Sequence, residues 1–326
     1  MLTASFPRFC PSLVLGPLLF VIYFRDLPSC ITSASCLFAD DTLLYATSPA
    51  NSFCSLIQED CERLDLWADT WNTVFNAKKS AHMVISTRRS NPPCDPVSLQ
   101  GLVVPLEKST KHLGVLLSPH LSWSDHVAML RAKVAPQVGL IKHLAYHSRG
   151  SQSRLSLSKF YMTFARPGLE YASAVWGSSC TSSDALYLER VQNYIARTIA
   201  RSSNSTEDVP VRSSALLKHL GWSTLAWRRR RSCLRFLWQL LHGEGPPQLS
   251  LSLPRTANAR CDYQLRRAES LESPLCSSSR HRNSFLPYSI AIYNALPPHV
   301  VSASRLSTFL QSVDSHFAYD KYCFGL

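Results

Sequence analysis

The sequence lacks the cysteine spacing that marks structural metal sites and disulfide frameworks. None of its 11 cysteines forms a Cys-x-x-Cys pair, and an odd number cannot pair completely within one chain. The 11 histidines add no ligand pair that we assign to structural zinc. A chain of 326 residues also buries a core without disulfide staples. We therefore expect a reducing compartment, free and mostly buried thiols, and no disulfide partner.

Apolar runs long enough to cross a membrane are missing as well. The run LVLGPLLFVIYF over residues 13–24 is too short for a spanning helix and is interrupted by Gly16 and Pro17. A signal peptide would end at small residues, whereas this run ends in RDLP at 25–28. The run predicts a buried helix over 18–24 with Pro17 in its first turn. We expect no signal peptide, no membrane partner and an intracellular protein, nuclear or cytoplasmic.

Acidic residues are scarce relative to basic ones. The chain has 22 Asp and Glu against 34 Lys and Arg, a net charge of +12. Residues 1–150 hold 13 basic and 11 acidic side chains, and residues 151–326 hold 21 and 11, so the excess lies in the second half. This imbalance indicates a polyanionic partner, either nucleic acid or membrane headgroups. A hydrophobic fraction of 45% excludes wholesale disorder.

The patterning predicts an α+β chain whose first part, about 120 residues, is mixed and whose remainder is helical. No internal repeat is visible. We expect a hairpin at 35–46, strands at 82–86, 102–105 and 112–117, a loop at 90–98, a linker at 246–284, and helices at 52–75, 124–147, 153–175, 184–201, 212–220, 223–243, 285–296 and 304–317.

Two adjacent acids, Asp40 and Asp41, stand at the turn of the predicted hairpin between two apolar strands. Neighbouring carboxylates in such a setting repel each other and cost desolvation energy, which a bound divalent cation removes. Mg²⁺ prefers hard oxygen ligands and commonly takes one or two carboxylates together with substrate phosphates. An isolated Asp-Asp pair is explained more simply as a turn, because Asp is a favoured turn residue.

The surroundings of this pair carry a resemblance that covers nearly the whole chain. The ordered segments are LGPLLFVIY at 15–23, DLP at 26–28, LFADDT at 37–42, NxxKS at 76–80, HLGV at 112–115, RPGLEYASAVW at 166–176 and RNSFLP at 282–287. Together they closely resemble the reverse transcriptase of non-LTR (LINE-type) retrotransposons, from the palm helix onward. Several ordered motifs in context carry far more weight than one.

The resemblance implies a partial right-hand polymerase palm, made of a helix and the antiparallel FADD hairpin, followed by a mostly α-helical thumb. The implied function is RNA-directed DNA synthesis from an RNA template and a DNA primer, with deoxynucleotides and Mg²⁺. Asp40 and Asp41 would be the metal ligands of a two-metal nucleotidyl transfer. Lys79 would stabilise or protonate the leaving pyrophosphate, although a lysine after a helix is often only a solvated cap. Gly114 would lie in the primer-grip strand that contacts nucleic acid.

The resemblance also divides the chain into five segments. They are a partial palm (1–90), a loop with primer-grip-like strands (91–123), a helical thumb-like region (124–245), a Ser/Pro/Arg-rich linker (246–284) and a C-terminal helical region (285–326).

Two departures from the family pattern bear on activity. The family's fingers and an earlier palm strand with another catalytic Asp precede the LGPLLF segment, but here no Asp or Glu stands before Asp26. The family's Gln-Gly-Ser before that segment is replaced by Pro11, Ser12 and Leu13, and Leu13 adds bulk where the backbone approaches template and nucleotide. We expect an incomplete metal site and no polymerase activity from the isolated chain. Whether this chain alone is an enzyme stays open.

A second constellation is the basic run Arg228–Arg231 with Arg235, flanked by Trp222, Trp227 and Trp238. Four consecutive arginines point all around a helix, so they cannot all be buried. One face would pack with its side-chain stems, while the others would contact phosphates and exposed aromatic rings would stack on bases. A solvated charge run explains the same residues equally well. The alternative function is therefore a catalytically dead, basic helical module that binds nucleic acid non-specifically.

Overall fold

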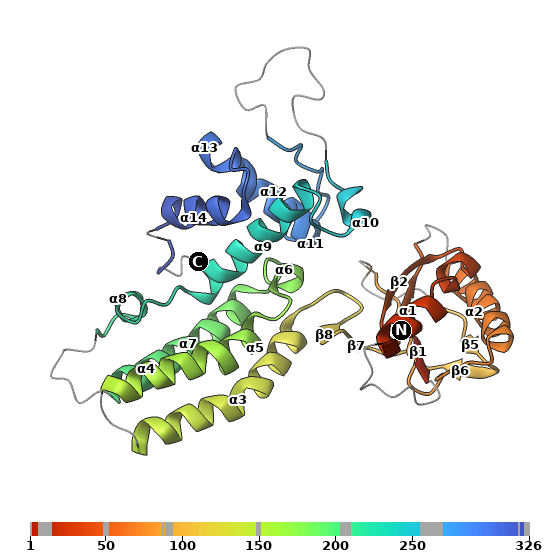
Figure 1. Ribbon diagram of the computed structural model, residues 1–326, viewed down its shortest axis with the longest axis horizontal. Helices are drawn as coiled ribbons and strands as arrows, with labels where there is room; N and C mark the ends of the chain where they lie inside the picture. The colour runs from red at the N-terminus through yellow and green to blue at the C-terminus, as the bar shows by residue number, and fades with distance from the viewer. Residues whose placement is uncertain are drawn as a thin grey trace, which may run out of the picture. The chain divides into compact units, whose positions relative to one another are not determined.

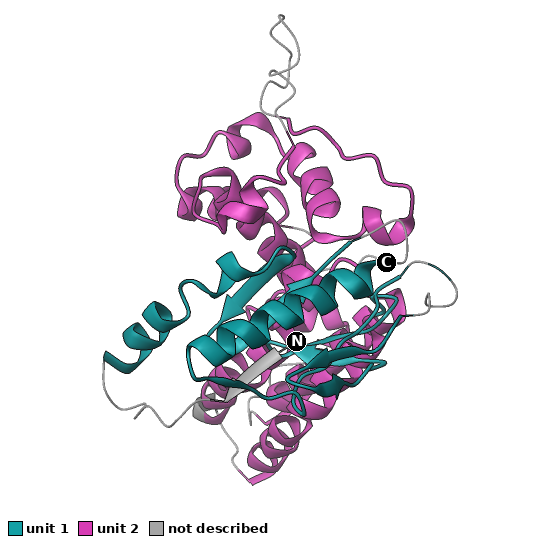
Figure 2. Cartoon of the chain, turned by 90° about the vertical axis from the view of Figure 1, so that its right-hand side faces the viewer, with its two compact units in different colours: residues 1–122 teal, residues 123–326 magenta. Residues whose placement is uncertain are grey.

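The computed structural model describes residues 2–5, 15–47, 52–86, 88, 94–147, 151–202, 210–254, 270–318 and 320–322. The chain forms two compact units, residues 1–122 and 123–326, coloured separately in Figure 2. The first unit mixes short strands with helices, and the described part of the second is almost entirely helical (Figure 1). The predicted α+β class is confirmed. Within the described ranges, no helix has the length and apolar character needed to cross a membrane.

The first unit is built on a four-stranded antiparallel sheet with strand order β2-β3-β1-β4. Its strands are β1 (Leu2–Ser5), β2 (Ala34–Phe38), β3 (Asp41–Tyr45) and β4 (Val74–Phe75). β2 and β3 form the predicted hairpin, which is confirmed with its turn at Ala39 and Asp40. β1 lies between β3 and β4, so the N-terminal segment joins the hairpin to the rest of the sheet.

Two helices accompany this sheet, α1 (Leu15–Tyr23) and α2 (Phe53–Thr70). The apolar side chains of α2 recur at helical spacing and form the core with residues from the flanking segments; the buried residues include Phe24, Leu27, Cys61, Leu64, Trp67, Ala68 and Phe75. A short 3-10 helix, η1 (Leu27–Cys30), follows α1.

The expectation that the first helix is buried is wrong. It begins at Leu15 and ends at Tyr23, with Pro17 in its first turn as predicted, yet none of its residues is buried. Its large apolar side chains are exposed: Leu15, Leu18, Leu19, Val21 and Ile22. The core receives instead the residues just after the helix, Phe24 and Leu27, because these are the ones that pack against α2.

Four short strands complete the first unit as two hairpins. They are β5 (Val97–Leu99), β6 (Leu102–Val104), β7 (Thr110–His112) and β8 (Val115–Leu117), with β5 paired to β6 and β7 to β8. β5 and the residue after it dock on α2 through hydrogen bonds that include those from Ser98 N–H to Gln58 at 2.7 Å and from Gln100 N–H to Asp65 at 2.9 Å.

Two strand predictions and one loop prediction need correction. The segment 82–86 is not a strand, and its one pairing is an isolated bridge between His82 and Leu106. The predicted single strand at 112–117 spans the end of β7, the turn and β8, because Leu113 and Gly114 both have positive φ (44° and 82°) and reverse the chain. The predicted loop at 90–98 contains the start of β5, and its residues 90–93 lie outside the described part.

In the second unit, three helices pack side by side: α3 (Ser124–His147), α4 (Ser151–Phe160) and α7 (Ser182–Arg201) (Figure 1). The predicted helix at 153–175 is interrupted twice. A π-helical turn, η2 (Tyr161–Ala165), leads into α5 (Arg166–Glu170), and Ala172 with φ 51° separates that helix from α6 (Ser173–Trp176). α8 (Ser213–His219) follows α7. The helices α3, α7 and α8 confirm the predictions at 124–147, 184–201 and 212–220.

The C-terminal part of this unit is organised around α9 (Leu225–Leu241), which confirms the helix predicted at 223–243. The remaining helices are α10 (Pro247–Ser250), α11 (Ser279–Arg282), α12 (Phe285–Asn294), α13 (Pro298–Val301) and α14 (Leu306–His316). α9 shares one apolar core with α12 and α14, whose buried residues include Trp227, Leu234, Leu237, Trp238, Ile290, Tyr293, Phe309 and Val313. The predicted helices at 285–296 and 304–317 are thereby confirmed.

The start of α9 is fixed by two side chains that accept its free N–H groups. Thr224 Oγ1 accepts from the N–H of Trp227 at 3.1 Å, as an N-cap residue does. Glu189 of α7 accepts from the N–H of Ala226 at 2.6 Å. A buried carboxylate at a helix N-terminus interacts favourably with the helix dipole. The Thr224 cap sets where α9 begins, and the Glu189 bond joins that start to α7.

The expectation of free thiols fails for one pair of cysteines. Cys54 in α2 and Cys94 before β5 form a disulfide across a sequence separation of 40 residues. Helix α2 and strand β5 pack together and bring the two residues within reach, which their spacing in the sequence does not reveal. The free cysteines among the described residues are Cys30, Cys36, Cys61, Cys180, Cys233 and Cys276.

Candidate active site

The two predicted catalytic acids occupy the turn of the β2–β3 hairpin. Phe38 and Asp41 pair across the turn, with Ala39 and Asp40 between them. Ala39 has φ 52°, a value that favours glycine, because a two-residue hairpin turn requires a left-handed residue here. Asp40 is exposed and Asp41 is half-buried at the first position of β3. The local sequence therefore presents both carboxylates at one end of the sheet.

Strand alternation places Asp41 on the outer face of the hairpin. Side chains of directly paired residues lie on the same face of a sheet, so Asp41 shares a face with Phe38. Phe38 is 63% exposed, whereas Thr42, on the opposite face, is buried. The outer face is thus an exposed, largely apolar surface with a carboxylate at its turn end.

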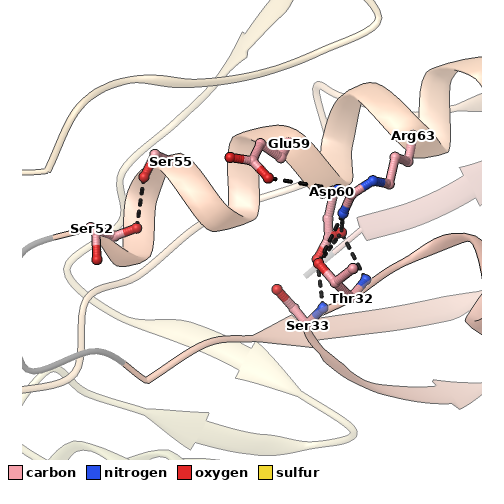
Figure 3. Close-up of polar contacts among 7 residues, drawn as sticks. All are labelled: Thr32, Ser33, Ser52, Ser55, Glu59, Asp60 and Arg63. Carbon is pink, nitrogen blue, oxygen red and sulfur yellow. Dashed lines mark hydrogen bonds and ion pairs between the residues drawn. The ribbon is translucent and has the colours of Figure 1, made fainter.

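The base of the hairpin is held by a buried carboxylate from α2 (Figure 3). Asp60 has no exposed surface and accepts hydrogen bonds from the backbone of Thr32 (2.9 Å) and Ser33 (2.8 Å), the two residues before β2. Arg63 Nη1 donates to the same carboxylate at 2.6 Å. Burial alone would raise the pKa of Asp60, but hydrogen bonds from Ser33, Thr32 and Arg63 lower it to about 2. Asp60 is therefore charged at neutral pH and fixes the entry to β2.

Lys79 lies in a tight turn after β4. The backbone carbonyl of Asn76 accepts from the N–H of Lys79 and from the Ser80 hydroxyl, and the Asn76 side chain also accepts from Lys79 N–H. Ser80 is buried and the Lys79 side chain is exposed. These local hydrogen bonds thus account for the Asn-x-x-Lys-Ser segment as a turn that exposes the lysine to solvent.

Gly114 occupies the turn of the β7–β8 hairpin, directly after His112 and Leu113. Burial lowers the pKa of the His112 imidazole, and the negative charge of Asp41 partly offsets the effect. The pKa of His112 therefore responds to the charge of the acidic turn as well as to burial. His112 Nδ1 is buried without a hydrogen-bond partner. The sequence predicts a role for Gly114 in this motif. The residue whose pKa responds to Asp41 is His112.

The arginine run in α9 is largely occupied by contacts within the chain. Arg228 forms a bidentate pair with Glu170, and Arg231 Nε donates to Asp314 at 3.0 Å. Arg229 is only 4% exposed and lies 5.9 Å from the ring of Trp176. Arg230 lies at 5.9 Å from the ring of Phe317, which leaves Arg235 as the exposed member of the run.

The tryptophans around this run do not form a stacking surface. Trp222, Trp227 and Trp238 are all buried, so the expectation of exposed aromatic rings at this place is wrong. The predicted packed face is confirmed, since Leu234 is also buried beside Trp227 and Trp238. The rings of Trp227 and Trp238 lie in the core because α12 and α14 cover this side of α9, and Trp222 stacks on Tyr161.

A different basic and aromatic surface lies on α7. Exposed tyrosines and arginines follow one another along one helix face: Tyr187, Arg190, Tyr194, Arg197 and Arg201, here called the α7 stripe. Arg131 of α3 lies 4.4 Å from the ring of Tyr187 and extends it. The spacing of three and four residues is visible in the sequence and is the signal that would have identified the stripe.

The residues that could hold a metal ion are few. No group of three or more His, Cys, Asp or Glu side chains suited to a metal occurs within the described ranges. Asp40 and Asp41 offer the oxygen donors that Mg²⁺ prefers, but they are only two carboxylate groups. The donor chemistry fits the ion, and a full coordination shell would have to come from water and phosphate oxygens.

Comparison with known proteins identifies relatives over about half of the chain. A probable RNA-directed DNA polymerase from transposon X-element of Drosophila melanogaster is 34% identical over 195 residues. The chain's curated relatives are RNA-directed DNA polymerases of non-LTR retrotransposons. Two others from the same fly are the polymerase from mobile element jockey, 26% identical over 204 residues, and the probable polymerase from transposon BS, 23% identical over 179 residues.

These matches cover 57%, 59% and 52% of this chain, respectively. They span 21%, 21% and 20% of the retrotransposon polymerases themselves, so the chain corresponds to about a fifth of each relative. No protein-family model matches the chain. No solved structure matches it either.

Proposed function

We propose that this chain is the part of a retrotransposon RNA-directed DNA polymerase that contains the palm hairpin and the helical thumb. The observation that carries the proposal is the β2–β3 hairpin, which presents Asp40 and Asp41 at an exposed turn, in a chain whose relatives are such polymerases. The residues 1–90 would form part of the palm and 124–245 the thumb. An RNA template, a DNA primer and deoxynucleotides would be the partners.

Asp40 and Asp41 would hold Mg²⁺ together with phosphate oxygens of a deoxynucleotide. When bound, the ions would activate the attacking 3′-oxygen and neutralise charge on the leaving pyrophosphate. The exposed outer face beside Phe38 leaves room for the primer end next to Asp41. Lys79, exposed on its turn, would place its ammonium near the leaving phosphates, and Gly114 would let the β7–β8 turn approach the primer backbone.

The 326 residues by themselves would not polymerise. Two carboxylates leave most of the coordination shell of each ion to water, and no third acidic or histidine ligand joins them within the described ranges. An ion held this loosely does not orient the reacting oxygens for in-line attack. Polymerisation would therefore need further groups to complete the site.

The experiment that tests the hairpin's role is a Mn²⁺ titration of the full chain, with and without dTTP, followed by paramagnetic broadening. Binding should be weak without nucleotide and at least about tenfold tighter with it, because triphosphate oxygens supply the missing ligands. Asp40→Asn/Asp41→Asn should abolish that gain, and Asp69→Asn/Glu107→Gln, which alters two exposed acids elsewhere in the same unit, should keep it. A gain that survives the first double substitution would refute the proposal.

A second candidate function is non-specific nucleic-acid binding by the basic half of the chain. The α7 stripe favours it, because two tyrosines, 43% and 46% exposed, lie among arginines on one helix face. Exposed aromatic rings stack on bases and arginines contact phosphates in proteins that bind single strands. Arg235, and those of Arg228–Arg231 that can leave their partners, would add phosphate contacts. Fluorescence anisotropy with labelled single-stranded RNA and DNA tests this function independently of catalysis.

A further inference from the structure

Cys54 and Cys94 meet at the junction between helix α2 and the segment before β5. Their Cα atoms are 5.9 Å apart and their sulfur atoms are joined. Cys54 is the second residue of α2 and is buried, and Cys94 is half-buried. Neither residue belongs to the hairpin or the α7 stripe, so the proposed function does not use this pair.

A histidine contacts one of the two sulfur atoms. His82 Nε2 lies 3.6 Å from Cys94 Sγ, and His82 Nδ1 lies 3.4 Å from the carbonyl oxygen of Val104. A carbonyl only accepts hydrogen bonds, so Nδ1 carries the ring proton and the lone pair of Nε2 faces the sulfur. Burial also lowers the pKa of His82, which keeps the imidazole neutral and able to accept a proton.

The other sulfur lies where a helix favours a thiolate. Cys54 stands in the first turn of α2, whose backbone N–H groups have no partners within the helix. The positive end of the helix dipole stabilises negative charge there and lowers the pKa of thiols. Each member of the pair thus has its own means of activation, a base for Cys94 and a helix N-terminus for Cys54.

We propose that Cys54 and Cys94 form a reversible dithiol–disulfide site in which Cys94 is the nucleophile and His82 its general base. In the reduced form, Cys94 gives its proton to His82 Nε2 and the thiolate attacks a sulfur of a small disulfide such as oxidised glutathione. One glutathione leaves as a thiolate and takes the proton from His82. Cys54 then attacks Cys94 Sγ in the mixed disulfide, and its proton passes to the second glutathione as that leaves. Two protein thiols are thus oxidised while one disulfide is reduced to two thiols.

The surrounding structure allows this cycle without unfolding. Helix α2 and the β5 segment are also joined by the Gln58–Ser98 and Asp65–Gln100 hydrogen bonds, which involve neither cysteine. Cysteines held this way stay within reach of each other in the reduced state. In the oxidised form, the disulfide joins two residues that are 40 positions apart, and the loop it closes contains Lys79 and its turn.

The test begins with full chain reduced by dithiothreitol and freed of reductant. Iodoacetamide is added at neutral pH, and alkylation of each cysteine is followed by peptide mass spectrometry. Cys36 is exposed and unpaired and is the internal reference. Cys94 should react at least about tenfold faster than Cys36, and His82→Gln should remove the advantage. His120→Gln, which alters a histidine bonded to the Ser86 carbonyl in the same unit, should leave it unchanged.

Oxidised glutathione provides the second arm. It should convert the reduced chain to the Cys54–Cys94 cross-linked peptide, and Cys54→Ser should stop the reaction with glutathione attached to Cys94. Alkylation of Cys94 no faster than that of Cys36, or glutathione accumulating on Cys36 without the cross-link, would overturn the proposal. Both comparisons are made in the wild-type chain, so they decide the matter even if a variant folds poorly.

Discussion

Ser33, the residue immediately before strand β2, donates its backbone N–H to the Asp60 carboxylate over 2.8 Å. Through this bond helix α2 holds the base of the hairpin whose far end carries Asp40 and Asp41. The acidic turn therefore depends on a buried charge that no catalytic motif includes. The same bond explains why a carboxylate without exposed surface is tolerated, since it is fully hydrogen-bonded and paired with Arg63.

Replacing Asp60 by Asn should destabilise the first unit by about 2–4 kcal/mol, because the amide places donors against the donors of Thr32, Ser33 and Arg63. Urea unfolding followed by tryptophan fluorescence measures the change. Asp69→Asn, at an exposed position of the same helix, should stay within about 0.5 kcal/mol of wild type. Equal effects of the two substitutions would show that the Asp60 bonds contribute nothing.

The same carboxylate predicts a pH dependence. The folded pKa of Asp60 is about 2, below the value of an unfolded Asp, so its contribution to stability is full above about pH 4 and is lost as the pH falls toward 2. The midpoint of urea unfolding should therefore fall over this range. The fall should be shallower in Asp60→Asn, which carries no titrating group at this position. Parallel curves for the two proteins would contradict the assignment.

Reducing the chain should weaken the first unit. Opening a loop closed over 40 residues costs up to about 4 kcal/mol through the gain in unfolded-state entropy. Urea unfolding with and without dithiothreitol measures the loss. Cys54→Ala should behave like the reduced wild type and should not respond to dithiothreitol. A wild-type chain equally stable in both conditions would mean that the cross-link does not constrain the unfolded chain.

The two arginine sets predict different salt dependences of nucleic-acid binding. Arg190→Gln/Arg197→Gln/Arg201→Gln removes the cations of the α7 stripe, and Arg228→Gln/Arg230→Gln/Arg231→Gln removes an equal number from α9. Each arginine that binds a phosphate should, when replaced, flatten the slope of log affinity against log salt by up to about one unit.

We expect the larger change from the stripe, because Arg228 and Arg231 are already paired with Glu170 and Asp314. Anisotropy titrations of the full chain from low to high salt give both slopes. A flatter slope of log affinity against log salt for the α9 variant than for the stripe variant would contradict this expectation. It would identify Arg228–Arg231 as the phosphate-binding surface.

Primer extension on an RNA template should give no product with the purified chain in Mg²⁺ or Mn²⁺. Within the described ranges, two carboxylates are the only candidate ligands grouped at this turn. They do not hold the metal ions firmly enough to activate the 3′-oxygen. The control is Asp40→Ala/Asp41→Ala, which should be indistinguishable from wild type. Extension by the wild type that the double variant loses would show that the chain completes its own site.

The hairpin could be predicted from the sequence because its information is local. Alternating residues, a two-residue turn and two aspartates all lie within the segment 35–46. The strands β5 to β8 are three residues each, and they depend on docking against other elements rather than on pattern. The strand predicted at 102–105 matches β6, whereas the prediction at 112–117 missed the turn at Leu113 and Gly114.

The fate of the arginine run could not be predicted for the opposite reason. Glu170 and Asp314 lie 58 and 83 residues away in the sequence from the arginines they pair with, and only packing of α5 and α14 against α9 brings them together. The Cys54–Cys94 pairing is non-local in the same way. Charge counts establish that a region is basic, but they do not reveal which cations the fold has already neutralised.

The left-handed backbone at Ala39 has a consequence for how well the acidic turn is defined. An alanine in this conformation costs roughly 1 kcal/mol that a glycine would not. A glycine, however, would widen the set of conformations open to the turn. The Ala39 side chain therefore makes the turn less stable than glycine would, but it restricts the backbone conformations of the turn. Asp40 and Asp41 then sample fewer orientations before any ligand binds.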